Sequence, residues 1–524
     1  MTETKREIER KYEAEDPAAG LPDLTRVRGV AAVRDEGVTD LDAVYYDTPD
    51  LRLAAASLTL RRRTGGADEG WHLKFPVASG IRDEIRAPLT ESLPRSLAGL
   101  LRSRVRTAPL VPVVRLLSHR DVRLLTAADG TALAELSVDQ VRAERLTGTE
   151  AAGDAGGTTA GAEAVWTEIE VELADDGDPA LLDAVEKRLR KAGIHPSPAA
   201  SKLARALTET GVRAPAPDPA SDRAADPADG TAGAAVLAYV RTQVDTLVTL
   251  DPAVRRDLPD AVHQLRVACR RLRSAFKTYG KVLDRTVTDP IGDELKWLAG
   301  ELGAARDLEV LHARCRAGLD ALPREQVIGP VRGRLRTWSS ARGGGSRRRT
   351  LTALDSARHL ALLDRLDALL TAPPLLPAAH TKAAKALPKA VRRDFRRLAD
   401  RVDHALSLTP GTTDRDLALH EARKAAKRAR YAGEAATPAL GRPARKFARR
   451  MKDVQTCLGD HQDSVVARTA LRELASQAHA AGESAFTWGV LHAREETAGE
   501  TRERELPELW ERAADPETLA ALGH

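Results

Sequence analysis

The N-terminal part of the chain alternates polar and apolar residues with a period of two, which is typical of β-strands. The clearest case is TEIEVEL, where Glu168, Glu170 and Glu172 share one face and the apolar residues between them share the other. Similar alternation occurs in EIERK, LTLRRR, WHLKF and RDEIR. We therefore predict several strands in this part of the chain, each with charge on one face only.

The C-terminal part has a different pattern, in which Ala, Leu, Arg and Glu recur at helical spacing and Pro and Gly mostly mark breaks. This pattern predicts an all-helical domain. Residues 208–232 are rich in Pro, Ala, Asp and Gly and predict a flexible linker, which places the two domains at 1–207 and 233–524. The Gly-rich stretches near 147–162 and at 341–349 are predicted to be loops.

Composition narrows the class of protein. The chain has 524 residues with 81 Lys and Arg against 76 Asp and Glu; residues 1–210 carry a net charge of −6 and the remainder +11. Aromatic residues make up only 3%, which disfavours a protein that stacks the bases of single-stranded nucleic acid. The charged start, the lack of a long apolar run and three widely spaced cysteines predict a cytoplasmic protein without membrane contact or disulfides.

The charged strand faces suggest a binding site. On a strand, Glu7, Glu9 and Lys11 point the same way, about 6.5 Å apart in succession. A single charged face usually meets solvent, but five such strands with apolar opposite faces fit an antiparallel barrel with a polar interior. An interior that holds both Glu and Arg or Lys needs a ligand with both signs of charge, such as a metal-bound oligophosphate.

The order of these motifs resembles the CYTH domain of the triphosphate tunnel metalloenzymes. ExExK begins at Glu7, and YYDT at 45–48, the basic strand ending at Arg63, and ExExE at 168–172 follow in the family's order up to Lys202. The resemblance implies an eight-stranded antiparallel tunnel that hydrolyses inorganic triphosphate with the help of Mg²⁺ or Mn²⁺. Nothing in the motifs indicates a covalent nucleophile.

The resemblance also implies a role for each matched residue. The metal ligands are Glu7, Glu9, Glu168 and Glu170. The residues expected to assist catalysis are Lys11, Glu84, Asp139 and Glu172, where Lys11 also belongs to the phosphate clamp. The residues expected to bind substrate phosphate are Arg61, Arg63, Lys74, Arg86, Arg120 and Lys202. Two alternatives stay open for Glu84, which either ligates metal or orients Arg86.

The C-terminal part contains an internal duplication. HQLRVACRRLR begins at His263 and the similar HEARKAAKRAR begins at His420, 157 residues later. A second pair, Leu302-Gly303 and Leu458-Gly459, repeats after 156 residues. This periodicity predicts two related helical bundles.

Each repeat places a cationic stripe on one helix face, because positions 0, +3, +7 and +10 fall on one side of a helix. The two stripes are His263, Arg266, Arg270 and Arg273, and His420, Arg423, Lys427 and Arg430. Residues 266–273 contain no acid, which favours a polyanion as the counter-charge over a merely solvated face. Each histidine either forms hydrogen bonds at a helix start or belongs to that site; neither has a carboxylate or Cys at metal-ligand spacing.

These blocks resemble the CHAD domain, through VHQLRVACRRLRS, LGAARDLEVL and LHEARKAAKRARYAGE. The resemblance implies binding of inorganic polyphosphate along a basic channel between the two bundles. A further basic cluster either lines that channel or is plain surface: Arg392, Arg393, Arg396 and Arg397.

The sequence therefore predicts an α+β protein of two domains, a CYTH-like triphosphatase tunnel followed by a CHAD-like domain of two duplicated helical bundles that binds polyphosphate. Three alternatives remain. The tunnel hydrolyses thiamine or nucleoside triphosphates instead; the whole protein is a non-catalytic polyphosphate-binding scaffold; or the helical part binds nucleic acid, which the few aromatic residues disfavour.

Overall fold

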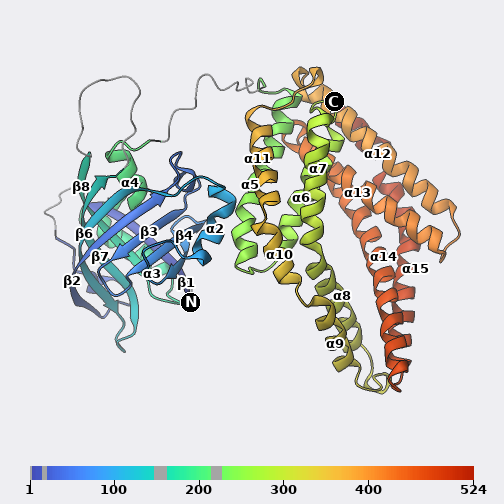
Figure 1. Ribbon diagram of the computed structural model, residues 1–524, viewed down its shortest axis with the longest axis horizontal. Coiled ribbons are helices and arrows are strands. Elements are labelled where there is room, and N and C mark those ends of the chain that lie inside the picture. The colour runs from blue at the N-terminus through green and yellow to red at the C-terminus, as the bar shows by residue number, and fades with distance from the viewer. Residues whose placement is uncertain (1–2, 15–19, 147–161, 214–226, 524) are drawn as a thin grey trace. The chain divides into compact units, whose positions relative to one another are not determined.

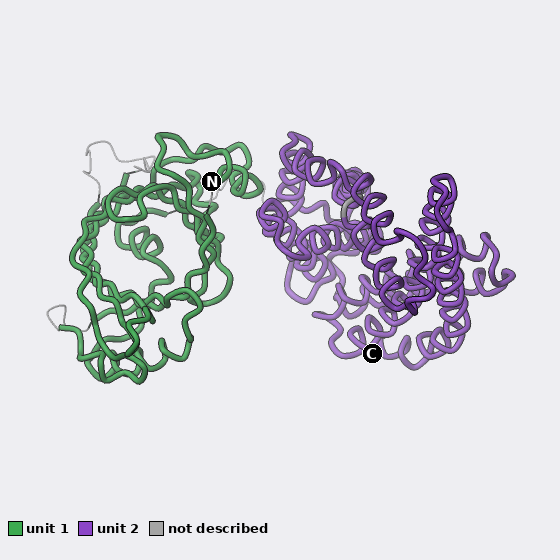
Figure 2. Tube along the Cα trace, turned by 90° about the horizontal axis from the view of Figure 1, so that it is seen from below, with its two compact units in different colours: residues 1–219 green, residues 220–524 purple. Residues whose placement is uncertain are grey.

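The computed structural model describes residues 3–14, 20–146, 162–213 and 227–523. The chain divides into two compact units, residues 1–219 and 220–524 (Figure 1, Figure 2). Residues 147–161 of the expected excursion, and residues 214–226 of the expected linker, lie outside the described part.

Within the described part of the N-terminal unit, eight antiparallel strands close into a barrel, which confirms the predicted fold class and is visible as a ring in Figure 2. The strand order is β5-β4-β3-β2-β6-β7-β8-β1, and β1 pairs with β5 to close the ring. The strands are β1 Glu3–Ala14, β2 Ala32–Asp47, β3 Thr59–Thr64, β4 Gly70–Ala78, β5 Ile81–Ala87, β6 Val111–Thr126, β7 Ala132–Arg145, β8 Glu163–Leu173 and the short β9 Ile194–Pro196, which pairs with the end of β1.

The apolar faces of the strands turn outward against helices, which leaves the charged faces for the lumen. Leu97 and Leu101 of α2 pack against β3, β4 and β5, while Leu182 and Leu189 of α3 pack against β1, β7 and β8. The helices of this unit are α1 Arg52–Ala55, α2 Arg95–Val105, α3 Ala180–Arg190 and α4 Lys202–Glu209. Burying apolar side chains on the outside of the barrel stabilises an interior that needs no apolar core of its own.

The C-terminal unit is helical, as predicted (Figure 1). Its helices are α5 Ala232–Arg255, α6 Ala261–Thr278, α7 Arg285–Glu301, α8 Gly303–Asp320, α9 Val331–Gly343, α10 Ser346–Asp355, α11 Ala357–Thr371, α12 Ala383–Ser407, α13 Thr413–Leu440, α14 Arg442–Ala480, α15 Phe486–Ala513 and α16 Pro516–Ala520. One large core joins α5, α6 and α7 with α12, α13 and α14, and a second core joins α8 and α9 with α14 and α15.

The internal duplication is also visible in two backbone hydrogen bonds at the starts of α5 and α12. Ala232 N donates to Thr381 O at 2.8 Å, and Ala383 N donates to Gly230 O at 2.9 Å. Residues 230 and 232 correspond to residues 381 and 383 after a shift of 151 residues, so each bond is the counterpart of the other. Helices α5 and α12 therefore hold equivalent places in their repeats.

Two sequence expectations concern the remaining segments. The Gly-rich stretch 341–349 was predicted to be a loop, and this is wrong: α9 extends to Gly343 and α10 begins at Ser346. The break is short because Gly345, with a positive φ of 81°, turns the chain directly into the next helix. No helix in the described residues is long and apolar enough to cross a membrane.

Candidate functional site

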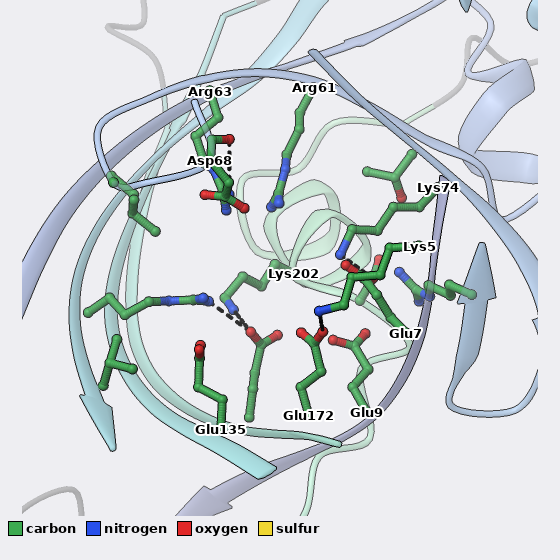
Figure 3. Close-up of a pocket in the computed structure, with 18 of the residues that line it drawn as sticks. Lys5, Glu7, Glu9, Arg61, Arg63, Asp68, Lys74, Glu135, Glu172 and Lys202 are labelled. Carbon is green, nitrogen blue, oxygen red and sulfur yellow. Dashed lines mark hydrogen bonds and ion pairs between the residues drawn. The ribbon is translucent and has the colours of Figure 1, made fainter. Parts of the chain in front are cut away.

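The barrel encloses a cavity of about 510 Å³ whose walls are charged (Figure 3). Among the described residues, nine basic and seven acidic side chains line it. Eleven of the residues that the sequence predicted to form the site are brought together here: Glu7, Glu9, Lys11, Arg61, Arg63, Lys74, Arg86, Arg120, Glu170, Glu172 and Lys202. The other three predicted residues, Glu84, Asp139 and Glu168, are buried in the wall behind them.

Strand register produces the acidic side of the lumen. Residues with the same parity face the interior, and β1 pairs with β8 so that Glu9 lies opposite Glu172 and Lys11 lies opposite Glu170. In Figure 3, Glu9, Glu172 and Glu135 gather on one side of the cavity. Carboxylates from three neighbouring strands thus share one wall.

The basic side of the lumen comes from β3 and β4. Arg61 and Arg63 project from β3 and lie across the cavity from Glu9, Glu172 and Glu135 (Figure 3). Lys74 projects from β4 and lies beside Glu7. The Nε atoms of Arg61 and Arg63 are buried and have no hydrogen-bond acceptor in the described residues. A buried N–H without an acceptor is costly, so these donors favour an anionic ligand.

Helix α4 brings Lys202 into the lumen. Ser201 caps this helix by accepting a hydrogen bond from Ala204 N at 3.0 Å, which fixes Lys202 in the first turn. The Lys202 ammonium lies 2.8 Å from Asp139 Oδ2 and 2.5 Å from Glu170 Oε2. The helix therefore adds a third cation to the carboxylates that Lys11 of β1 and Arg120 of β6 also contact.

Asp139 also fixes Arg120, which belongs to the neighbouring strand. Arg120 donates to both carboxylate oxygens of Asp139, at 2.7 and 2.9 Å, and to Glu170 Oε2 at 2.9 Å. Burial would raise the pKa of Asp139, but Lys202 and Arg120 hold it below its usual range. Asp139 is thus a charged support that orients two cations rather than a group exposed to the cavity.

Ammonium groups lie between the carboxylates that were predicted to bind metal. Lys11 contacts Glu170 and lies 3.5 Å from both Glu9 and Glu168, and Lys74 lies 2.6 Å from Glu7. Burial would raise the pKa of Glu9, but Lys11 and Lys74 hold it well below its usual range, so the group is ionised at neutral pH. Ionised carboxylates are hard oxygen donors of the kind that divalent cations prefer.

Glu84 is fully buried behind the lining residues and is not exposed to the cavity. It accepts a hydrogen bond from Arg86 Nε, and it lies 2.9 Å from His72 Nδ1 and 3.5 Å from the Lys74 ammonium. Of the two sequence alternatives, this geometry fits the one in which Glu84 orients Arg86.

Five charged lining residues were not among the predicted ones: Lys5, Glu36, Asp68, Arg82 and Glu135. Lys5 and Glu135 line the lumen, and Lys5 pairs with Glu172 at 2.6 Å. Lys5 continues the period-two face of Glu7 and Glu9, so the alternation was a signal that could have found it. Glu135 lies on β7, which the sequence analysis did not identify as a strand, but it shares the strand face of the predicted residue Asp139. Asp68 pairs with Arg63 from the loop between β3 and β4, where no periodicity applies.

The two cationic stripes of the helical unit face each other. Burial lowers the pKa of Lys427 to about 7, together with Arg423 on its own helix and Arg270 on α6. Glu434 of α13 accepts from Arg271 of α6 at 3.2 Å and from Arg430 at 2.7 Å, so one carboxylate joins the two helices. The repeats therefore bring their basic faces together.

Glycine allows equivalent arginines to lie on the facing helices. A Cβ at Gly303 would lie 3.0 Å from an Nη of Arg266, and one at Gly459 would lie 3.5 Å from Arg423. Arg266 pairs with Asp307 at 2.8 Å, four residues after its glycine, and Arg423 lies 3.8 Å from the equivalent Asp463. The glycines of the two Leu-Gly motifs thus leave the space in which these two arginine side chains pack.

The expectation that the stripes lack acidic partners is wrong for three of their five arginines, Arg266, Arg423 and Arg430. Asp307 and Asp463 come from distant sequence positions, which the local pattern does not show, whereas Glu434 lies four residues after Arg430 on the same helix. In the described residues, Arg270, Arg273 and Lys427 have no ion pair, and His263 and His420 lie at the ends of the stripes. The Nε atoms of Arg266, Arg270 and Arg423 are buried without an acceptor.

A buried acidic group also lies in the helical unit. Asp416, His461 and Glu503 each place one ligand atom within 4.8 Å of the others. Arg468 lies 3.1 Å from Asp416, and Arg415 lies 2.6 Å from Glu503. Because two guanidinium groups neutralise the two carboxylates, the cluster serves as an ion-pair network that joins α13, α14 and α15.

The chain thus combines two kinds of domain. The first is a closed barrel with a lumen of mixed charge, and the second is a duplicated helical unit with facing basic stripes. The chain belongs to two families: residues 5–207 match the CYTH domain and residues 238–472 match the CHAD domain. The barrel is therefore a triphosphatase-family domain.

The chain is similar to three proteins that differ in how much they share with it. It is 40% identical over 511 residues to an uncharacterized protein of Mycobacterium tuberculosis, covering 95% of this chain and 94% of that protein. It is 40% identical over 75 residues to a thiamine-triphosphatase of Macaca fascicularis, covering 14% of this chain and 29% of that protein. PptA from Streptomyces chartreusis is similar in structure, with a TM-score of 0.46, 25% identity, and coverage of 54% of this chain and 99% of that chain.

Proposed function

We propose that the barrel hydrolyses inorganic triphosphate with Mg²⁺ or Mn²⁺, and that the helical unit binds inorganic polyphosphate. One observation carries both halves of the proposal. Buried arginine Nε atoms lack acceptors in both places, at Arg61 and Arg63 in the lumen and at Arg266, Arg270 and Arg423 in the stripes. Phosphate oxygens are the acceptors that best match such donors.

The lumen has the charge distribution that a metal-bound triphosphate needs. The basic side would bind phosphate oxygens, and Glu7, Glu9, Glu168 and Glu170 on the acidic side would hold the cation. Lys11 and Lys74 pair with these carboxylates in the described structure. A ligand that carries both signs replaces these pairs without leaving either set of charges uncompensated.

Phosphoryl transfer requires position and charge compensation more than covalent chemistry. Bound metal would supply charge neutralisation and activate the attacking water. Arg61, Arg63 and Lys74 would fix the phosphate groups, while Glu84 holds Arg86 in place and Asp139 holds Arg120 and Lys202. Positioning by these buried ion pairs costs little reorganisation during the reaction.

A second candidate substrate is an organic triphosphate such as thiamine triphosphate. Leu41 of β2 and Val122 and Leu124 of β6 line the cavity on neighbouring strands and offer an apolar surface to an organic group. The similarity of 75 residues to a thiamine-triphosphatase supports the same candidate.

Phosphate release from four substrates tests the proposal and separates the candidates. We expect the full chain to release phosphate from tripolyphosphate faster than from thiamine triphosphate, ATP or long-chain polyphosphate, in the presence of Mg²⁺ or Mn²⁺ and not of EDTA. Preference for thiamine triphosphate or ATP would favour the second candidate. Binding of polyphosphate without any phosphate release would instead favour a non-catalytic scaffold.

The lowered pKa of Lys427 predicts proton uptake when polyphosphate binds. With a pKa of about 7, this ammonium is partly deprotonated at neutral pH, and a nearby polyanion restores its charge. Affinity should therefore decrease as pH rises through about 7, by roughly threefold for this one charge. Lys427→Arg, which stays charged, should remove that pH dependence, whereas the control Lys424→Arg on the same helix should keep it. Isothermal titration calorimetry in buffers of different ionisation enthalpy measures the uptake, and equal uptake by Lys427→Arg and the wild type would contradict the assignment.

A further inference from the structure

The outer face of α12 carries a concentration of cations separate from the two stripes. Two hollows, of about 550 and 660 Å³, lie along this helix and share Arg393 and Arg396. We call this surface the α12 face; it consists of Lys385, Lys389, Arg393, Arg396, Arg397 and Arg401.

The α12 face has little acidic compensation. Arg393 donates to Thr278 O, but the other members make no ion pair with any described residue. Asp394, on the same helix, is buried and bonded to Arg428 at 3.0 Å, so it does not reach the surface. Asp400 is the acid that lines a hollow here. The six cations of the face therefore outnumber the one carboxylate that lines its hollows.

The duplication provides an internal comparison. Helix α5 holds the equivalent place in the first repeat, as the reciprocal hydrogen bonds of Ala232 and Ala383 establish. Its positively charged residues are Arg241 and Arg255, whereas α12 carries seven Lys and Arg residues. Because a helix with few cations fills the same place, the fold does not require the charge of α12. Clustered like charges cost stability, which indicates that the α12 face has a ligand.

The α12 face is continuous with the end of the α6 stripe. One turn beyond Arg273, Lys277 O accepts a hydrogen bond from Arg428 Nη2 at 2.9 Å. The next carbonyl, Thr278 O, accepts from Arg393 of α12. Cations therefore follow one another from α6, over Arg428, onto α12 without an intervening acidic surface residue among these contacts.

We infer that the α12 face binds the continuation of an inorganic polyphosphate chain that leaves the two stripes, so that longer chains bind more tightly than short ones. This inference rests on the proposed function of the stripes. From Lys385 to Arg401 the helix adds about 24 Å of basic surface. Nucleic acid fits less well, because the aromatic residue lining these hollows, Tyr279, is buried and offers no stacking surface.

Chain-length dependence tests the inference. The variant Lys389→Gln with Arg396→Gln and Arg397→Gln removes three charges and spares Arg392 and Arg393, which hold backbone carbonyls. The control is Arg336→Gln with Arg348→Gln and Arg349→Gln, three exposed arginines on α9 and α10. Dissociation constants of the full chain would be measured in EDTA for short-chain polyphosphate, long-chain polyphosphate and duplex DNA.

We expect the α12 variant to lose at least roughly tenfold in affinity for long chains, with a change for short chains no larger than that of the control. Equal losses for both chain lengths, losses equal to the control's, or a loss confined to DNA would each overturn the inference. A second variant, Arg270→Gln with Lys427→Gln, separates a failure of the proposed stripe function from a failure of the inference about the α12 face. If that variant binds both chain lengths like the wild type, the proposed stripe function fails, and the inference that rests on it fails too.

Discussion

Replacing Glu7 and Glu9 together by glutamine should reduce metal-dependent phosphate release by at least roughly a hundredfold. Loss of a residue that merely supports a metal ligand already costs about 10- to 100-fold, and this variant removes two of the proposed ligands themselves. Residual activity should need more Mg²⁺ or Mn²⁺ for half-saturation. Phosphate release at a series of metal concentrations measures both effects.

The fold should survive this change. Without the Glu7 carboxylate, Lys74 still lies 3.5 Å from Glu84, and without that of Glu9, Lys11 still contacts Glu170. Glutamine keeps the volume, and burial together with Glu84 and Glu172 already raises the pKa of Glu7, so its charge is costly in the folded state. We therefore expect a thermal melting temperature close to that of the wild type.

The matched control is Glu144→Gln with Glu163→Gln, which removes two charges from β7 and β8 of the same barrel at positions that do not line the lumen. It should hydrolyse tripolyphosphate at the wild-type rate. Unchanged turnover in the Glu7, Glu9 variant with a normal melting temperature would exclude both residues from the site. Equal losses in the variant and the control would mean that activity follows net charge.

The lumen was predictable from the sequence because strand geometry is periodic. The side chains of Glu168, Glu170 and Glu172 must share a face whatever the register, and the apolar residues between them must face the covering helices. The residues that lie opposite them on the neighbouring strands could not be predicted. Which strand pairs with β8, and hence that Lys11 lies opposite Glu170, depends on long-range pairing that no local pattern contains.

The partners of Arg266 and Arg423, which are Asp307 and Asp463, could not be predicted for the same reason. The sequence of one helix shows the charges on its own face but not those of the helices that pack against it. Asp307 lies 41 residues from Arg266 in sequence, yet it pairs with that arginine because α8 packs near α6. The motif Leu302-Gly303 indicated a repeated structural feature, but the sequence did not show that an arginine packs against its glycine.

These partners change the way the stripes should be tested. Arg266 contacts α8 through Asp307 and Arg430 contacts α14 through Gln455, so removing these arginines would confuse folding with binding. Arg270 and Lys427 have no ion pair in the described residues and belong to opposite repeats. The double variant of these two residues is therefore the sharpest probe of a channel between the repeats.

Arg270→Gln with Lys427→Gln should weaken polyphosphate binding by at least roughly tenfold and reduce the slope of log affinity against log salt concentration by about two, one for each lost phosphate contact. If both residues contact the same chain, the two single variants should not add up to the double, since each would leave the chain free to shift toward the other repeat. Titrations of the wild type, both single variants and the double at several salt concentrations measure the slopes and the coupling. Arg336→Gln with Arg348→Gln removes the same charge from exposed positions on α9 and α10 and should leave the slope nearly unchanged. A slope that falls equally in both doubles would show that binding follows net charge, and the facing stripes would then have no special role.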